Sequence, residues 1–161
     1  MKKFLVSILA LITCLSFVGC TKKYVKNIEA NEISKALQRS ITTEGGYREA
    51  GESFMPLNIA APEHCIKEFR IVEATDDKNQ NEIGVFRANS TADAKEIAKY
   101  CQKYIDNEKA NYNPDFDPDE AVKTDNAKVH IFGIYVIYTI LTPEDTDYAL
   151  IVIDNLISEG A

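Results

Sequence analysis

Three aspartates stand at alternate positions in an acidic segment of the chain, Asp115, Asp117 and Asp119. This spacing is typical of the start of a calcium-binding loop, in which carboxylate oxygens are the ligands. A loop of the EF-hand type also requires glycine at its sixth position and glutamate at its twelfth. Counted from Asp115, these positions hold Glu120 and Asn126, so both requirements fail.

Helix capping explains the same acidic segment without a metal. Asp117 would cap a helical turn, Pro118 would take its first position, and Glu120 would complete a capping box. We therefore expect no metal and no cofactor. Asp115, Asp117 and Asp119 are the residues that a metal ion would use.

A cysteine beside a histidine is the other pattern that could support catalysis, because a histidine can activate a thiol nucleophile. His64 precedes Cys65, but neighbours in a helical turn point about 100° apart and do not pair. His130 lies on a predicted strand two residues after Lys128, where we expect it to face solvent. A dyad of Cys65 with His130 is an alternative that no spacing in the sequence supports.

No other catalytic pattern stands out. The sequence contains no G-x-S-x-G motif and no glycine-rich loop opening a helix. Pairs of carboxylates are plentiful in a chain with 25 acidic residues, so their presence selects no reaction. The sequence therefore favours a protein that is not an enzyme.

The N-terminus has the pattern of an export signal. Met1-Lys2-Lys3 is basic, and the uncharged run from Phe4 to Val18 is shorter than the roughly 20 apolar residues that span a bilayer. A basic start, a short apolar stretch and small residues before a cleavage site are typical of a secretory signal peptide. The alternative is an uncleaved N-terminal anchor helix.

The end of this run, Phe17-Val18-Gly19-Cys20, resembles the bacterial lipobox. The resemblance implies that the Cys20 thiol receives a diacylglyceryl group and that cleavage leaves Cys20 as the new N-terminus. Phe17 departs from the pattern, which usually has leucine there. Two acyl chains, at about 0.8 kcal/mol per buried CH2, would hold the protein firmly on a membrane. The lysines that follow in 20–28 would meet anionic head groups.

The sequence therefore divides into a lipoprotein signal peptide (1–19), a lipidated cysteine with a short tether (20–28) and a single α+β domain (29–161). Removing residues 1–19, which carry two lysines and no acidic residue, takes the formal charge from −7 to −9. Such a surface repels phosphate backbones, so we expect no nucleic-acid partner. The expected location is extracytoplasmic, on the outer face of the cell membrane.

Two cysteines, Cys65 and Cys101, remain after Cys14 leaves with the signal and Cys20 takes the lipid. An extracytoplasmic location permits a disulfide between them. Cys101 falls on the apolar stripe of a predicted helix, so we expect two buried thiols that act as small hydrophobic groups.

Hydrophobic periodicity predicts the elements of the domain. A helix is expected over 29–41, a loop over 42–61 and a helical turn over 62–66. Strands over 69–74 and 82–88 form a hairpin, and Ser90 with Asp93 begins a long helix. Strands follow over 127–132 and 134–141, the second apolar on both sides as in a covered central strand.

Thr142 and Pro143 begin the last helix, and its expected buried stripe consists of Tyr148, Ala149, Val152 and Leu156. The predicted order is α-β-β-α-β-β-α. We predict an antiparallel four-stranded sheet with three main helices, an α+β fold.

Strand alternation suggests an interaction patch. If all three helices cover one face of the sheet, the other face would expose Val72, Phe86, Phe132 and Tyr138, and exposed apolar patches mark contact sites. In the alternative, the helix at 29–41 or the loop at 42–61 covers these side chains.

Several stretches together resemble a family of small bacterial lipoproteins catalogued as domain of unknown function 4358. They are Asn81-Glu82-Ile83-Gly84-Val85-Phe86-Arg87-Ala88, the helix after it, the proline-containing acidic loop and Gly133-Ile134-Tyr135-Val136. The likeness covers roughly residues 55–158. It implies a lipid-anchored surface protein of Gram-positive bacteria and supplies no ligand, activity or active residues.

The function we expect is a lipid-anchored binding or interaction module of the cell envelope that is not an enzyme, with an unknown protein or envelope ligand as partner. The alternative is a small envelope hydrolase using Cys65 or a carboxylate, which a pocket joining Cys65 to His130 would favour. A solute receptor of an importer is a third hypothesis, but such receptors usually need two lobes.

Overall fold

The structure, a computed structural model, describes residues 27–158. Its helices are α2 (Ala30–Ser40), α3 (Thr91–Asn111), α4 (Pro118–Asn126) and α5 (Pro143–Ile157), with a π-helical turn at Met55–Ile59 and a 3-10 turn at Glu63–Cys65. Its strands are β1 (Tyr47–Glu49), β2 (Ile66–Ala74), β3 (Glu82–Ala88), β4 (Lys128–Phe132) and β5 (Tyr135–Ile140).

All the strands form one antiparallel sheet in the order β1-β2-β3-β5-β4. The connections from β2 to β3 and from β4 to β5 make hairpins. The second hairpin turns on Gly133, whose φ of 62° suits the first central position of a two-residue loop. Because β3 and β5 lie inside the sheet, every residue of both strands is buried.

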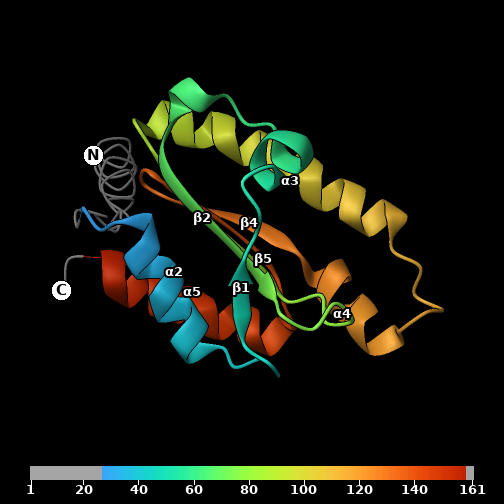
Figure 1. The fold of residues 1–161 in the computed structure, drawn as a ribbon. Helices are drawn as coiled ribbons and strands as arrows, with labels where there is room; N and C mark the ends of the chain where they lie inside the picture. Colours follow the sequence, from blue (N-terminus) through green and yellow to red (C-terminus); the bar gives the residue numbers. More distant parts are fainter. Residues whose placement is uncertain (1–26, 159–161) are drawn as a thin grey trace, which may run out of the picture.

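Helices cover both faces of the sheet, so the fold has three layers (Figure 1). On one face, α3 packs against a cluster that includes Phe86, Val136 and Tyr138. On the other face, α2 and α5 lie side by side over a cluster that includes Val72 and Val85. Each strand alternates between these two cores, which explains why the central strands are apolar at nearly every position.

The α+β class and the antiparallel sheet are confirmed, but the predicted four strands and three helices are wrong in number. The structure has five strands, because the segment predicted as a loop over 42–61 contains β1 and the π-helical turn. It also adds α4 between α3 and β4. β1 has three residues, which is too brief a pattern to detect by periodicity. α4, with nine residues, is longer than the helical turn that was predicted to start at Asp117.

The predicted helix starts are confirmed by their caps. The side chain of Ser90 accepts a hydrogen bond from the Asp93 N–H at 3.1 Å, and Thr142 accepts one from the Asp145 N–H at 3.2 Å. The predicted buried stripe of α5 is partly wrong. Ala149 is buried as expected, but Tyr148 is 49% exposed.

Candidate functional site

The lipidation residue Cys20 and the whole predicted signal peptide lie outside the described residues. The first described residues attach to the sheet on the α5 side. The Tyr135 hydroxyl accepts from the Ile28 N–H at 2.7 Å and donates to the Ile28 carbonyl at 2.8 Å. The buried Arg87 guanidinium donates to Asn27 and to Glu68. Within residues 27–158, no helix is long and apolar enough to cross a membrane.

The predicted aromatic patch is wrong, since its members do not share a face. Strand pairing places Phe86 and Tyr138 under α3, whereas Val72 and Phe132 lie on the face of α2 and α5. Phe86 and Tyr138 are completely buried, and Val72 is 2% exposed. The cause is that the helices divide between the two faces, so no face of the sheet is left open.

The two thiols are free and buried, as predicted. Burial raises the pKa of Cys101 to about 12, and burial together with the nearby Asp93 raises the pKa of Cys65. Both thiols are therefore protonated near neutral pH and poorly nucleophilic.

A Cys65–His130 dyad is incompatible with the sheet. Cys65 immediately precedes β2, and His130 lies on β4, three strands away in the sheet order. Strands are about 4.8 Å apart, so about 14 Å separate the two strands. The expectation that His130 faces solvent is wrong. Its ring is half-buried under α5, and burial and the charge of Lys128 lower its pKa.

The alternating aspartates form the start of α4, as the capping hypothesis predicted. Asp117 Oδ1 accepts from the Asp119 N–H at 3.1 Å and from the Glu120 N–H at 3.2 Å, and Pro118 is the first helical residue. Asp115 and Asp119 are exposed. In the part of the chain that the structure describes, no three acidic, cysteine or histidine side chains are placed to hold a metal ion.

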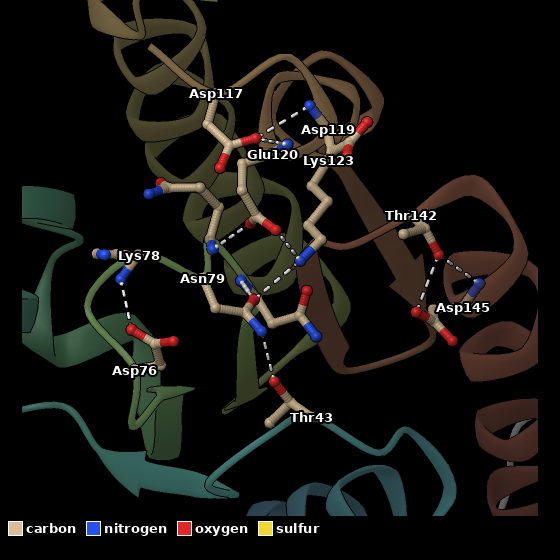
Figure 2. A network of polar contacts seen from close by, with 12 residues as sticks. Thr43, Asp76, Lys78, Asn79, Asp117, Asp119, Glu120, Lys123, Thr142 and Asp145 are labelled. Atoms are coloured by element: carbon tan, nitrogen blue, oxygen red, sulfur yellow. Dashed lines mark hydrogen bonds and ion pairs between the residues drawn. The ribbon is translucent and has the colours of Figure 1, made fainter.

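Glu120 does not close the predicted capping box but joins α4 to the β2–β3 turn (Figure 2). Its carboxylate accepts from the Gln80 N–H at 2.6 Å and from Lys123 Nζ at 2.7 Å. Lys123 also donates to Asn79, whose amide donates to Thr43 at 2.7 Å. The acidic segment therefore has a structural use, because it connects α4 to the β2–β3 turn and, through Asn79, to Thr43.

We expect Asp117→Ala to lower the free energy of unfolding by about 1 kcal/mol, because it removes the acceptor of two N–H groups at the start of α4. Urea denaturation measures this change. Asp115→Ala, which alters an exposed carboxylate outside the cap, is the matched control and should have little effect. Millimolar calcium should not raise the melting temperature of either variant or of the wild type; a rise that is lost in Asp117→Ala would restore the metal hypothesis.

A buried acid, which sequence reasoning missed, lies at the start of β3. Glu82 is 8% exposed, and its carboxyl group accepts from the Tyr138 hydroxyl at 2.5 Å and the Tyr104 hydroxyl at 2.9 Å. Burial raises the pKa of Glu82 to about 7, against the lowering effect of the two hydroxyl groups. Its partners are 22 and 56 residues away along the chain, so only the folded sheet brings them together.

A broad concave surface lies where the edge strand β4 meets α5. This β4–α5 groove, of about 500 Å3, is lined by residues 130–132 of β4 and by Leu150, Ile151, Asp154 and Asn155 of α5. Ile131 is 45% exposed and Ile151 57% exposed. Tyr148, which is also exposed, lies one turn before Ile151 on the same helix. By alternation, the side chain of Ile131 lies on the α3 face, so Ile151 and Tyr148 of α5 are the exposed apolar side chains near the groove.

The backbone of β4 adds unpaired hydrogen-bonding groups to the rim of the groove. The Ala88 N–H donates to the Ile134 carbonyl, so even-numbered residues of β5 bond to β3 and odd-numbered residues bond to β4. Lys128, His130 and Phe132 pair with those odd-numbered residues. Val129 and Ile131 therefore direct their N–H and C=O groups away from the sheet, and no strand of residues 27–158 pairs with that edge.

The walls of the groove differ in charge. Within α5, Glu144, Asp145, Asp147 and Asp154 are acidic and no residue is basic. On β4, Lys128 carries a positive charge, and the lowered pKa of His130 keeps that ring neutral at pH 7. The α5 wall is therefore negative, whereas the β4 floor carries the positive charge of Lys128.

Comparisons with family models, curated proteins and solved structures found no match to this chain.

Proposed function

We propose that this protein is a lipid-anchored, extracytoplasmic module of the bacterial cell envelope that binds a partner at the β4–α5 groove and is not an enzyme. The observation that carries the proposal is the groove itself, where exposed apolar side chains lie next to a strand edge with unpaired backbone groups. Such an edge favours association with another chain. The N-terminal sequence, a basic start and a short apolar run that ends at Gly19-Cys20, supports the lipid anchor and the location.

The tether would keep the domain close to the membrane. Seven residue steps separate Cys20 from Asn27, the first described residue, and an extended chain of that length reaches about 25 Å. Asn27 and Ile28 are bonded to Arg87 and Tyr135 at one end of the sheet. A lipid on Cys20 would therefore hold this end of the domain toward the bilayer.

We expect Cys20→Ala to release the protein from membranes almost completely, because the substitution removes the thiol that takes the lipid. Fractionation of cells into membrane and soluble parts, followed by immunoblotting, measures the change. Cys14→Ala is the matched control, since that cysteine leaves with the signal peptide, and it should keep the protein on the membrane. Full membrane association of the Cys20→Ala protein would contradict the lipid anchor.

The alternative, a small envelope hydrolase, has less support from the contacts. Cys65 is buried, and its strand is far from His130. Both carboxyl oxygens of Glu82, the acid with the most raised pKa, accept hydrogen bonds from tyrosines of the core. These groups are placed to hold the fold together rather than to meet a substrate.

Site-specific photo-crosslinking in cells tests the binding proposal. A photoreactive side chain at Ile151, in the groove, should form an adduct with an envelope component. The same side chain at Leu57 or Phe116, which are even more exposed but lie elsewhere, should not. Equal adduct yields at all three positions, or none at Ile151, would contradict the groove as the binding site.

A further inference from the structure

We propose that the β4–α5 groove is the interface between two copies of this chain, in which the two β4 strands pair antiparallel about a two-fold axis at His130 and join the two sheets. The inference rests on the proposed function, because it names the partner that binds at the same groove. Four features carry it: the register of β4, the side chains on the two faces of that strand, the charges of the groove and the place where the tether enters the domain.

The register of β4 is self-complementary at its centre. Val129 and Ile131 direct their N–H and C=O groups outward on either side of His130. When His130 lies opposite His130 of a second copy, Val129 of each copy lies opposite Ile131 of the other. These are hydrogen-bonded pairs, and each such pair exchanges two bonds, so the interface forms up to four backbone hydrogen bonds. No bond between β4 and β5 is lost.

The side chains on the α3 face match in the same register. Val129 packs partly against the core under α3, and Ile131 beside it is nearly half exposed. The pairing would place each Ile131 directly across from a Val129, with their Cβ atoms about 4.5–5.5 Å apart. Apolar, β-branched side chains would therefore cover each other at two symmetric positions, which removes exposed apolar surface from both copies.

On the other face of the joined sheet, the two-fold axis makes the two α5 helices run antiparallel to each other. Ile151 lines the groove together with His130, so the two Ile151 side chains would lie near the axis, with Tyr148 one turn away. Three of the four acids of α5 precede Tyr148, and one follows Ile151. The antiparallel arrangement therefore places the acidic half of each helix beside the less acidic half of the other, and the exposed apolar residues meet at the centre.

Charges of both signs occur in the groove, which favours a second copy over a foreign strand. Lys128 lies on the α5 face of β4 and forms no ion pair within residues 27–158. In the proposed pairing, Lys128 lies opposite Phe132 of the other copy, which lines that copy's groove beside α5. The lysine of each copy is therefore directed to the negative α5 wall of the other. A foreign strand of a single charge would be repelled either by Lys128 or by the acids of α5, whereas a second copy brings the opposite charge to each.

The tether enters both copies from the same side of the joined sheet. Ile28 is bonded to the Tyr135 hydroxyl on the face that α2 and α5 cover. A two-fold axis perpendicular to the sheet keeps that face on one side for both copies. Since the seven residue steps from Cys20 to Asn27 reach about 25 Å, both lipids can enter one membrane. Two copies held in one membrane also meet at a raised local concentration.

Disulfide crosslinking of the full-length, lipidated protein in membranes tests the register. A residue on the axis lies opposite itself, at a Cα separation of about 4.5 Å that a disulfide bridges. His130→Cys should therefore give a covalent dimer on non-reducing gels after mild oxidation with copper phenanthroline. Lys128→Cys, which lies opposite Phe132 rather than itself, and Glu52→Cys on a distant exposed loop should give at least ten-fold less, and equal yields would overturn the register. Both thiols of residues 27–158 are buried, so they add little background.

Two second substitutions, each made in the His130→Cys protein, separate backbone pairing from charge. Ile131→Pro removes an outward N–H without removing a bond to β5 and should lower the dimer yield at least ten-fold, whereas Ile131→Thr keeps the N–H and should lower it far less. Lys128→Glu places like charges at the interface and should lower the yield several-fold; Lys67→Glu makes the same charge change on an exposed residue of β2 and should not. Lys128→Glu alters an exposed side chain, so it remains informative if Ile131→Pro fails to fold. Undiminished dimer in both variants would overturn the pairing.

The mass of the photo-adduct at Ile151 separates this inference from the proposed function. An adduct with the mass of two copies supports both. An adduct with a different envelope component, together with no His130→Cys dimer, overturns this inference and leaves the proposed function standing. No adduct at Ile151 overturns both. An adduct of two copies without a His130→Cys dimer would overturn strand pairing, because the copies would then meet in another way.

Discussion

Gly84→Ala is expected to lower the free energy of unfolding by about 3 kcal/mol or more, because the ring of Tyr138 lies directly against the glycine. A Cβ at position 84 would overlap Cε1 of Tyr138 and come within 2.5 Å of its Cδ1 and Cζ. The two residues are directly opposite in the β3–β5 pairing, so the backbone cannot separate them without breaking the sheet. The residue therefore has to be glycine for reasons of space rather than of backbone conformation.

The ring of Tyr138 has little freedom to move away from an added methyl group. Its hydroxyl donates to Glu82, and it makes an edge contact with Tyr104 at a centroid distance of 5.5 Å and a tilted contact with Phe86 at 6.4 Å. The tyrosine is completely buried. Displacing it would disturb the aromatic core under α3 and leave a buried carboxyl group with one hydrogen bond fewer.

Thermal and urea denaturation of Gly84→Ala measure the effect. Gly51→Ala is the matched control, since a Cβ there meets no atom within 4 Å, and it should leave stability unchanged or slightly higher. In a Tyr138→Leu background, which removes the overlapping ring atoms, the cost of Gly84→Ala should fall by at least half. An unchanged cost in that background would show that the overlap with Tyr138 is not the cause.

The sequence allowed correct prediction of the features that depend on neighbouring residues. Ser90, Asp117 and Thr142 cap helices where expected, since a cap and the N–H groups it satisfies lie within three residues of each other. The break between the strands predicted over 127–132 and 134–141 is confirmed, and it depends in the same way on Gly133 and its neighbours. The burial of Cys101 followed from the spacing of its helix. In each case, the residues that determine the feature are close neighbours in the sequence.

The features that sequence reasoning missed depend on pairing over long distances. Val72 and Phe86 seemed to share a face because alternation was counted along each strand without the register between strands, which places Val72 opposite Ile83 and Phe86 opposite Phe69. The β4–α5 groove exists because β4 is an edge strand of the sheet. The order of strands in a sheet cannot be predicted from the residue pattern of one strand. Exposed apolar residues on α5 were a usable signal, but Tyr148 was assigned to the core.

The buried acid Glu82 should make the stability of the domain depend on pH in the direction opposite to that of an ordinary ion-paired acid. Burial raises the pKa of Glu82 in the folded protein to about 7, from an ordinary value of 4.5. Between these values, the folded state holds a proton that the unfolded state has released. Stability from this group is therefore fully present below about pH 4.5 and is lost as pH rises through 7.

We expect Glu82→Gln to remove this dependence, because glutamine has nearly the same shape and stays neutral. From the pKa difference, the stability of the wild type should fall between pH 5 and pH 8 by about 2–3 kcal/mol more than that of the variant. Urea denaturation at the two pH values measures both proteins. Glutamine can still accept from one tyrosine hydroxyl and donate to the other, so the variant should fold.

The comparison isolates Glu82 because other titrating groups are present in both proteins. His130, whose pKa is lowered by burial and Lys128, is destabilising as pH falls below its ordinary value of 6.5, and this opposite effect cancels in the difference. Glu52→Gln, which alters an exposed acid of a loop, should reproduce the wild-type profile. Parallel profiles for the wild type and Glu82→Gln would mean that Glu82 titrates normally and that the two tyrosines hold an ionised carboxylate in the core.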